Sequence, residues 1–394
     1  TFDVSASGIK PGEQFTVKVR AIFGSLSSQD AELRGNTKPL PPSAPEFQSR
    51  GTNSLRLQGN GPSTDGTVFD GYEADSTPGI VDGPTIVDNG DSTYQVQLES
   101  LTPGTRYTVE VWTYSGDEES DRVSNQFYTT PEEPGPISRD TNTVSTTDKL
   151  AVSWIEPASG SIEGYEVSLS KDGESAIIEI KKVTSTTAQF TGLDPGQLYD
   201  VSVKSYVGGN VYSTPETNQL STKPLPATNL EMKSSTSNSL TVQWSDPQSG
   251  SFDKYLVKIM GQGNQEEVSK KSQGTYENTF IDLAGTEFNI EVITVSHGQQ
   301  SESKTVKIFT KPESPSNLQQ ESTTSDSITV KWDAPTSPNF DNYRITIDTQ
   351  GSPSEVLDST KSSYTFDGLD AATQYTITLI SLRANDERDR KSVV

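Results

Sequence analysis

The residues that could support catalysis are few in this chain. There is one histidine, His297, which stands beside Gly298, and there is no cysteine. One histidine permits at most one Ser-His-Asp triad, and the count excludes zinc sites that need cysteine and several histidines. His297 lies in a predicted hairpin turn, where a side chain usually points into water. No Gly-x-x-x-x-Gly-Lys-Ser/Thr phosphate loop occurs either, so we expect no catalytic, cofactor-binding or metal-binding residue.

Carboxylates are plentiful: 54 Asp and Glu stand against 31 Lys and Arg, which gives a net charge of −23. This surplus argues against nucleic acid or an anionic membrane as a partner. No run approaches the roughly 18–20 apolar residues of a membrane span, so no membrane contact is expected within this stretch. The densest acidic run is Asp117-Glu118-Glu119-Ser-Asp121. It is either a solvated loop or a site for calcium or a basic partner.

Trp112 is the second candidate for recognition. It follows Tyr107 on an alternating run in which Tyr107, Val109 and Val111 are predicted to point inward, so Trp112 is predicted to face outward. An outward tryptophan is either an interface anchor or a side chain that packs under a neighbouring loop or joint. The candidate protein-binding residues are therefore Trp112, Asp117, Glu118 and Glu119.

A repeat places these residues in the chain. The stretch Leu193-Asp-Pro-Gly-Gln-Leu-Tyr199 returns as Leu101-Thr-Pro-Gly-Thr-Arg-Tyr107, Leu369-Asp-Ala-Ala-Thr-Gln-Tyr375, Ile9-Lys-Pro-Gly-Glu-Gln-Phe15 and, shortened, Leu283-Ala-Gly-Thr-Glu-Phe288. Its aromatic residue recurs about every 90 residues, and a fixed period decides the architecture. We expect small tandem domains, each just large enough to fold alone.

Residues 131–222 show the internal pattern most clearly. Alternating runs such as Leu150–Trp154 and Tyr165–Leu169 are separated by turn signals, and Lys171-Asp-Gly-Glu174 is a strong hairpin signal. Seven short strands with no helical period predict an all-β fold of tandem seven-stranded antiparallel β-sandwiches. A tryptophan ends the second strand and a tyrosine follows eleven residues later at 154 and 165, 244 and 255, and 332 and 343. These pairs are predicted to lie in the cores.

Proline-rich joints suggest the boundaries of the modules, because proline suits first or edge strands. We expect the second half of a module at 1–37, full modules at 38–130, 131–222 and 223–310, and a nearly complete module at 311–394. The partial modules at both ends suggest a piece of a longer protein. Module 38–130 is the exception, because Gly59 stands where the others carry tryptophan. We expect Phe69, from a longer loop, to fill that space.

The Trp on the second strand, the Tyr on the third and the Leu-x-Pro-Gly-x-x-Tyr motif resemble the fibronectin type III module, an immunoglobulin-like sandwich. The resemblance covers essentially the whole chain, and it implies a tyrosine corner at Tyr107, Tyr199 and Tyr375, whose hydroxyls return to nearby backbone. Phe15 and Phe288 lack that hydroxyl. The joints and strands are most similar to ectodomains of receptor-type tyrosine phosphatases with fibronectin repeats alone, and tenascin-like matrix proteins follow closely.

The resemblance implies an extracellular spacer and protein-binding array of a larger cell-surface receptor, without enzymatic activity in this stretch and without cofactors. It leaves open whether the parent protein carries a cytoplasmic tyrosine phosphatase domain. Two alternatives remain: a matrix or adhesion protein of tenascin type, and linker modules of a secreted carbohydrate-active enzyme. The expected partner is a protein ligand at the cell surface or in the matrix.

The short proline-rich joints predict an extended array. Strands of ~8–10 residues at about 3.3 Å each make a module roughly 30 Å long, so five full or partial modules should form a rod on the order of 130–150 Å. Small-angle X-ray scattering would measure this length. A radius of gyration near the ~21 Å of a single globule of this chain length would contradict the prediction.

Overall fold

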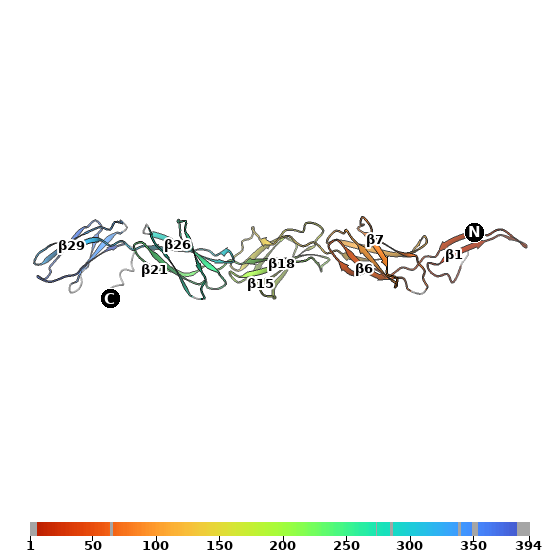
Figure 1. Cartoon of the computed structure of the whole chain (residues 1–394), viewed down its shortest axis with the longest axis horizontal. Helices are drawn as coiled ribbons and strands as arrows, with labels where there is room; N and C mark the ends of the chain where they lie inside the picture. Colours follow the sequence, from red (N-terminus) through yellow and green to blue (C-terminus); the bar gives the residue numbers. More distant parts are fainter. Residues whose placement is uncertain are drawn as a thin grey trace. The chain divides into compact units, whose positions relative to one another are not determined.

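The computed structural model describes residues 6–63, 66–272, 274–283, 287–337, 340–348 and 354–383, and all regular structure in these ranges is β-strand. The described strand pairs are antiparallel and link strands that are near one another in the sequence. The strands fall into five successive groups (Figure 1). By contacts, the chain divides into two compact units, 1–192 with 198–220 and 193–197 with 221–394. The predicted all-β class is confirmed.

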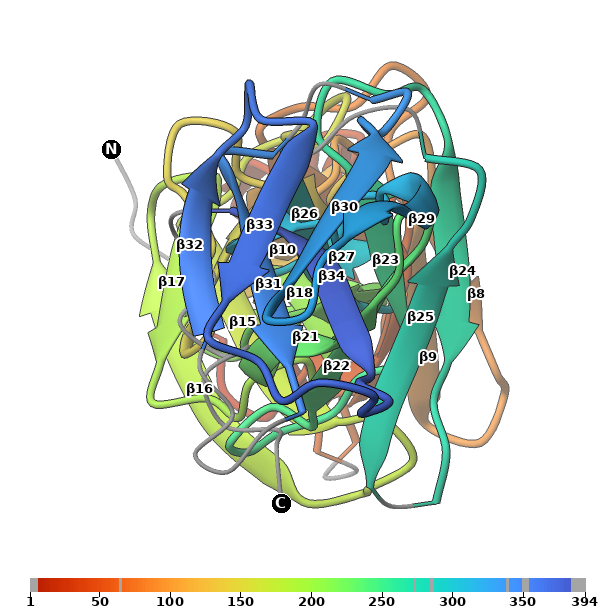
Figure 2. The ribbon, with the colours of Figure 1, turned by 90° about the vertical axis from the view of Figure 1, so that its left-hand side faces the viewer.

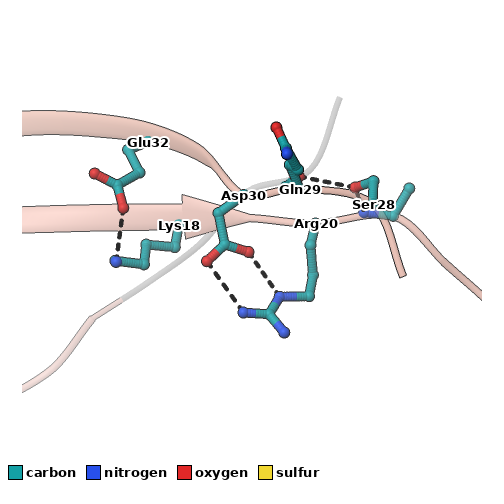
Figure 3. A network of polar contacts seen from close by, with 7 residues as sticks. Lys18, Arg20, Ser28, Gln29, Asp30 and Glu32 are labelled. Carbon is teal, nitrogen blue, oxygen red and sulfur yellow. Dashed lines mark hydrogen bonds and ion pairs between the residues drawn. The ribbon is translucent and has the colours of Figure 1, made fainter. Parts of the chain in front are cut away.

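The first group is a partial sheet. It contains β1 (Gln14–Val19), β2 (Ile22–Phe23), β3 (Leu26–Ser27) and β4 (Ala31–Asn36), with β1 paired to β4 and β2 to β3. Cross-strand ion pairs hold its outer end, where Lys18 lies 2.6 Å from Glu32 and Arg20 makes two hydrogen bonds to Asp30 (Figure 3). Most of its apolar side chains are exposed, Phe23 by 87%, whereas Phe15 and Val17 are half-buried. The half module predicted at 1–37 thus exposes much of its apolar surface.

The second group forms a sandwich of two sheets. One sheet has the order β5 (Glu46–Arg50), β6 (Leu55–Asn60), β9 (Thr93–Leu98) and β8 (Thr85–Asp88). In the other, β10 (Arg106–Ser115) lies between β7 (Gly71–Thr77) and both β11 (Glu118–Glu119) and β12 (Val123–Tyr128). The strand β8 thus pairs with β9, through an Asn89-Gly90 turn, and leaves β7 at the edge of the second sheet.

The third and fourth groups share one topology of three plus five strands. In the third, β13 (Ser138–Arg139), β14 (Lys149–Ser153) and β17 (Thr187–Thr191) face β15 (Gly164–Lys171), β16 (Ile177–Val183), β18 (Leu198–Val207), β19 (Val211–Tyr212) and β20 (Glu216–Ser221). In the fourth, β21 (Thr228–Ser235), β22 (Leu240–Ser245) and β25 (Thr275–Phe280) face β23 (Lys254–Ile259), β24 (Gln265–Ser269), β26 (Glu287–Ser296), β27 (Gln299–Gln300) and β28 (Lys304–Phe309). The predicted hairpin after β15 is present, since the Glu174 N–H donates to the Lys171 carbonyl at 3.0 Å.

The fifth group repeats the arrangement in its described part. One sheet contains β29 (Ser316–Thr323), β30 (Ser327–Asp333) and β33 (Ser363–Asp367), and the other contains β31 (Asn342–Ile347), β32 (Ser354–Asp358) and β34 (Ile377–Leu382). Each β-group after the first therefore encloses its own core between two sheets.

The core tryptophans lie as the sequence predicts. Trp154, Trp244 and Trp332 are at most 5% exposed. Each meets its tyrosine edge-on across the two sheets, with ring centroids 5.1 Å apart for Trp154–Tyr165 and 5.5 Å apart for the pairs Trp244–Tyr255 and Trp332–Tyr343. This is the favourable T-shaped arrangement of aromatic rings.

The tyrosine corner is confirmed at two positions. The Thr102 N–H donates to the Tyr107 hydroxyl at 3.0 Å, and the Asp370 N–H donates to the Tyr375 hydroxyl at 2.8 Å. The third corner residue, Tyr199, is buried, with 1% of its surface exposed. Each corner closes the loop that carries the Leu-x-Pro-Gly motif or its Ala-Ala variant.

The glycine of the Pro-Gly motif also contacts the group that follows. Gly12 and Gly104 have φ values of 77° and 63°, and a Cβ there would lie 1.6 Å from the Val68 carbonyl oxygen and 1.9 Å from that of Ser161. The Val68 N–H in turn donates to the carbonyl of Pro11 at 3.0 Å, and the Ser161 N–H donates to that of Pro103 at 3.1 Å. Within the second unit, Ser251 makes the same bond to Pro195 at 2.9 Å. Only glycine fits such a position.

The space beside Gly59 is filled, but the expected residue was wrong. A Cβ on Gly59 would lie 2.3 Å from the ring and the hydroxyl of Tyr94, the residue paired with it on β9. Tyr94 is fully buried, and its hydroxyl donates to the Ser43 carbonyl at 2.7 Å. Burial raises the pKa of this phenol, which keeps it a neutral donor. Phe69 is only half-buried and packs edge-on against Tyr72. Tyr94 lies on β9, directly opposite Gly59, so its ring fills the space above Gly59 and the loop that carries Phe69 does not need to fold inward.

We therefore expect Tyr94→Ala to destabilise the second group by about 3–5 kcal/mol, because it empties a closed site, whereas Phe69→Ala should cost clearly less. Hydrogen–deuterium exchange over Leu55–Asn60 in the whole chain would report the change locally. Equal protection in Tyr94→Ala and the unmodified chain would contradict this assignment.

Candidate functional site

Trp112 lies on β10, on the side of the sheet that faces away from the core. Its neighbours Val111 and Thr113 are fully buried, and its cross-strand partner is Glu73 on β7. The outward direction is as predicted, yet the tryptophan itself is only 6% exposed. Something outside the sandwich therefore covers the indole.

The cover is Arg122, between β11 and β12. Its guanidinium carbon lies 3.8 Å from the centroid of the Trp112 ring, a close cation–π contact. Two carboxylates hold the guanidinium in place, since its nitrogens lie 3.5 Å from Glu110 and 3.5 Å from Glu119. The flat guanidinium suits both roles, because it stacks by its face and pairs by its edge. Of the two alternatives for Trp112, packing under a neighbouring segment describes its present state.

The acidic residues lie in the hairpin between β10 and β11. Ser115 pairs with Glu118 and Tyr114 with Glu119, and Gly116 makes the turn at a φ of 59°. The Gly116 N–H donates to the Asp70 carboxylate at 2.8 Å, which fixes the turn from the opposite side. Asp117, Glu118 and Glu119 are exposed. The hairpin therefore presents three carboxylates on a fixed backbone.

The structure brings only part of the predicted set together. Trp112 and Glu119 share Arg122, whereas Asp117 and Glu118 continue the acidic surface along the hairpin. Sequence reasoning missed Arg122 and Glu110. The pairing of Val111 with Val123 puts residue 122 next to residue 112, and the sequence indicates this only once the length of the turn at Gly116 is known. The remaining acid of the run, Asp121, lies 2.6 Å from Lys38 and is used in an ion pair.

The inner side of the same hairpin is tied to the preceding segment. The Thr113 hydroxyl donates to the Leu40 carbonyl and the Ser115 hydroxyl to the Gly12 carbonyl, both at 2.7 Å. The Asn36 amide donates to the Ser115 hydroxyl at 2.8 Å. These bonds within the first unit fix the base of the hairpin, so its acidic side is held outward.

His297 occupies the predicted hairpin turn. It is exposed, has a φ of 46°, and its N–H donates to Asp253 at 2.6 Å. Its ring Nδ1 lies 3.1 Å from the Ser296 hydroxyl. In the described ranges, no three His, Asp or Glu side chains gather as a metal site would require. Nor does that part of the chain contain an apolar helix of membrane-spanning length.

Comparison with known proteins gives concordant matches. The fibronectin type III domain family matches residues 40–129, 135–223, 225–309 and 313–393. Human tenascin-N is 26% identical over 387 residues, which are 96% of this chain and 29% of that protein. Human receptor-type tyrosine-protein phosphatase H is 23% identical over 351 residues, 86% of this chain and 30% of that protein. The chain thus spans less than a third of the length of these relatives.

Solved structures contain similar domains. A segment of two fibronectin type III domains from chicken tenascin matches with 22% identity and a TM-score of 0.31, and covers 45% of this chain and 100% of that segment.

The Arg122 cover leads to a fluorescence prediction. All four tryptophans of the chain are at most 6% exposed, so acrylamide should quench the unmodified protein weakly. Arg122→Ala removes the cover from Trp112 alone, and we expect stronger quenching and a red-shifted emission from one tryptophan in four. Arg106→Ala, an exposed residue at the far end of the same strand, is the matched control. If both variants are quenched alike, Arg122 is not what shields the indole.

Proposed function

Because the chain belongs to the fibronectin type III domain family, we propose that it is an extracellular array of modules that serves as a spacer and as a protein-binding surface. The observation that carries the binding role is the Arg122–Trp112 stack beside the acidic hairpin. Modules of this family are structural and carry no catalytic machinery, so this stretch is not an enzyme.

The module boundaries belong to the same proposal. We place them at the proline-rich joints, near Lys38, Pro131, Lys223 and Lys311, with residues 1–37 as the second half of a module. The family matches begin within four residues of each of these positions. The two such hydrogen bonds of the first unit, Val68 to Pro11 and Ser161 to Pro103, support the spacer role, because each joins a loop of one group to a loop of the next by main-chain atoms.

The binding surface consists of Trp112, Arg122, Glu110 and the hairpin acids Asp117, Glu118 and Glu119. The carboxylates favour a partner with a basic surface, because complementary charge steers association and suppresses wrong partners. The guanidinium of Arg122, stacked on the buried indole, adds a planar cationic centre to this surface. Aromatic residues and arginine are the groups that most often dominate the binding energy of protein interfaces. Asp117 and Glu118 act in this scheme through charge rather than through a contact to the stack.

Two parent proteins fit the proposal equally. One is an adhesion or matrix protein of tenascin type, and the other is a cell-surface receptor with a phosphatase domain elsewhere in the protein. Both put this stretch outside the cell with a protein or matrix partner. The alternative of linker modules in a carbohydrate-active enzyme draws no support from the relatives named above.

Cell attachment to surfaces coated with the whole chain tests the binding role. Glu118→Lys with Glu119→Lys should lower attachment several-fold, because the hairpin charge is reversed and Arg122 loses one of its two partners. The matched control is Glu266→Lys with Glu267→Lys on β24, which changes the net charge equally at another module. Loss in both variants would indicate a general charge effect, and attachment that neither variant changes would contradict the assigned surface.

A further inference from the structure

The strand β16 leaves one edge of the third group's larger sheet open. It pairs with β15 along one side (Figure 2), and no strand of the described residues pairs with its other side. Its sequence is Ile-Ile-Glu-Ile-Lys-Lys-Val. Ile177, Ile178 and Ile180 are 56%, 49% and 52% exposed. A free strand edge with exposed isoleucines is a template for pairing with another strand.

The corresponding edges in the other groups differ. The edge strands β24 (Gln-Glu-Glu-Val-Ser) and β32 (Ser-Glu-Val-Leu-Asp) each carry two carboxylates and no lysine. In the second group, β8 lies in the opposite sheet. Only β16, among these four strands, combines three exposed isoleucines with charges of both signs, the negative Glu179 and the positive Lys181 and Lys182. The feature is thus specific to one module and not a property of the repeat.

Lysines on an edge usually prevent pairing, because they project across it. Here both are held by their own module. The Lys181 ammonium donates to the Gln189 carbonyl and lies 3.2 Å from Glu179. The Lys182 ammonium lies 4.8 Å and 5.2 Å from the ring centroids of Tyr206 and Tyr212. These contacts draw both ammonium groups onto their own module, so neither projects across the edge as a charged barrier.

We propose that β16 pairs antiparallel with β16 of a second copy of this chain, centred on Ile180. This register puts Glu179 opposite Lys181 of the second copy twice, once on each side of the symmetry axis, and puts Ile177 opposite Val183. The two charged residues also lie on the same face of the sheet. Glu179 pairs with the buried Leu169 and Lys181 with the buried Val167 on β15, so both charged side chains are on the core-facing side. Opposite charges directly across an antiparallel pair are stabilising. The pairing is self-complementary, as a closed twofold dimer requires.

We expect a weak dimer, because the interface between two such strands is small. A seven-residue strand buries far less than the ~1,200 Å² of a stable interface, so we expect a dissociation constant of roughly 10–1,000 µM. The net charge of −23 does not prevent association at about 0.15 M salt, because repulsion between distant surface charges is screened beyond ~8 Å.

Sedimentation equilibrium of the whole chain over about 1–1,000 µM tests the proposal. The unmodified chain should pass from monomer to dimer. Glu179→Lys and Lys181→Glu should each weaken self-association on the order of tenfold or more, because like charges then face each other twice. A mixture of these two variants should dimerise again, since both pairs between positions 179 and 181 are then opposite in charge. Val356→Lys, an exposed residue on the edge strand β32, is the control that should leave the dimer intact.

The alternatives give different results. A chain that stays monomeric throughout overturns the proposal, and so do higher oligomers, which would indicate head-to-tail pairing of β16 with an acidic edge such as β24. Failure of the mixed variants to associate would exclude the Ile180 register. Circular dichroism of each variant confirms that its sheets are intact, and a variant that has lost them is replaced by Ile180→Lys, which puts two lysines on the axis and should also abolish the dimer.

Discussion

Three of the four sandwiches depend on a contact between a tryptophan at the end of the second strand and a tyrosine on the third. Trp154 directly follows β14 and Tyr165 lies on β15, and these two strands belong to opposite sheets, so the edge-on contact of the two rings holds the sheets together. The pairs Trp244–Tyr255 and Trp332–Tyr343 do the same. Every core is therefore complete within about 90 residues, and the surfaces that remain for recognition are the outer faces, edges and hairpins.

The second module shows how the same contact can be replaced. Gly59 removes the tryptophan, and Tyr94 enters from the adjacent strand while Tyr72 keeps its place, with the two rings 5.2 Å apart. The period, the alternation and the Trp–Tyr spacing were readable in the sequence because they repeat. The identity of the filler was not, because a cross-strand partner depends on the register between β6 and β9, which brings Tyr94 opposite Gly59.

The candidate site was predictable to the same extent. Alternation along β10 placed Trp112 outward, and the acidic run was visible as composition. The arginine that covers the indole was missed, since a cover comes from the return strand and its position depends on the length of the turn at Gly116. A surface tryptophan in such a sheet is thus best judged together with the residue across the hairpin. The free edge at β16 was equally hidden, because only the pairing partners distinguish an edge strand from a central one.

The Pro-Gly contacts have a consequence for how such a chain is assembled. Gly12, Gly104 and the loops they meet interact through main-chain atoms, with the carbonyls of Val68 and Ser161, and the side chains at those two positions are unrelated. Because these contacts involve only main-chain atoms, they can form with any module whose loop has the right backbone conformation. Copies of the unit can then be duplicated, deleted or exchanged by recombination without redesign of the neighbours, while their outer faces diverge freely.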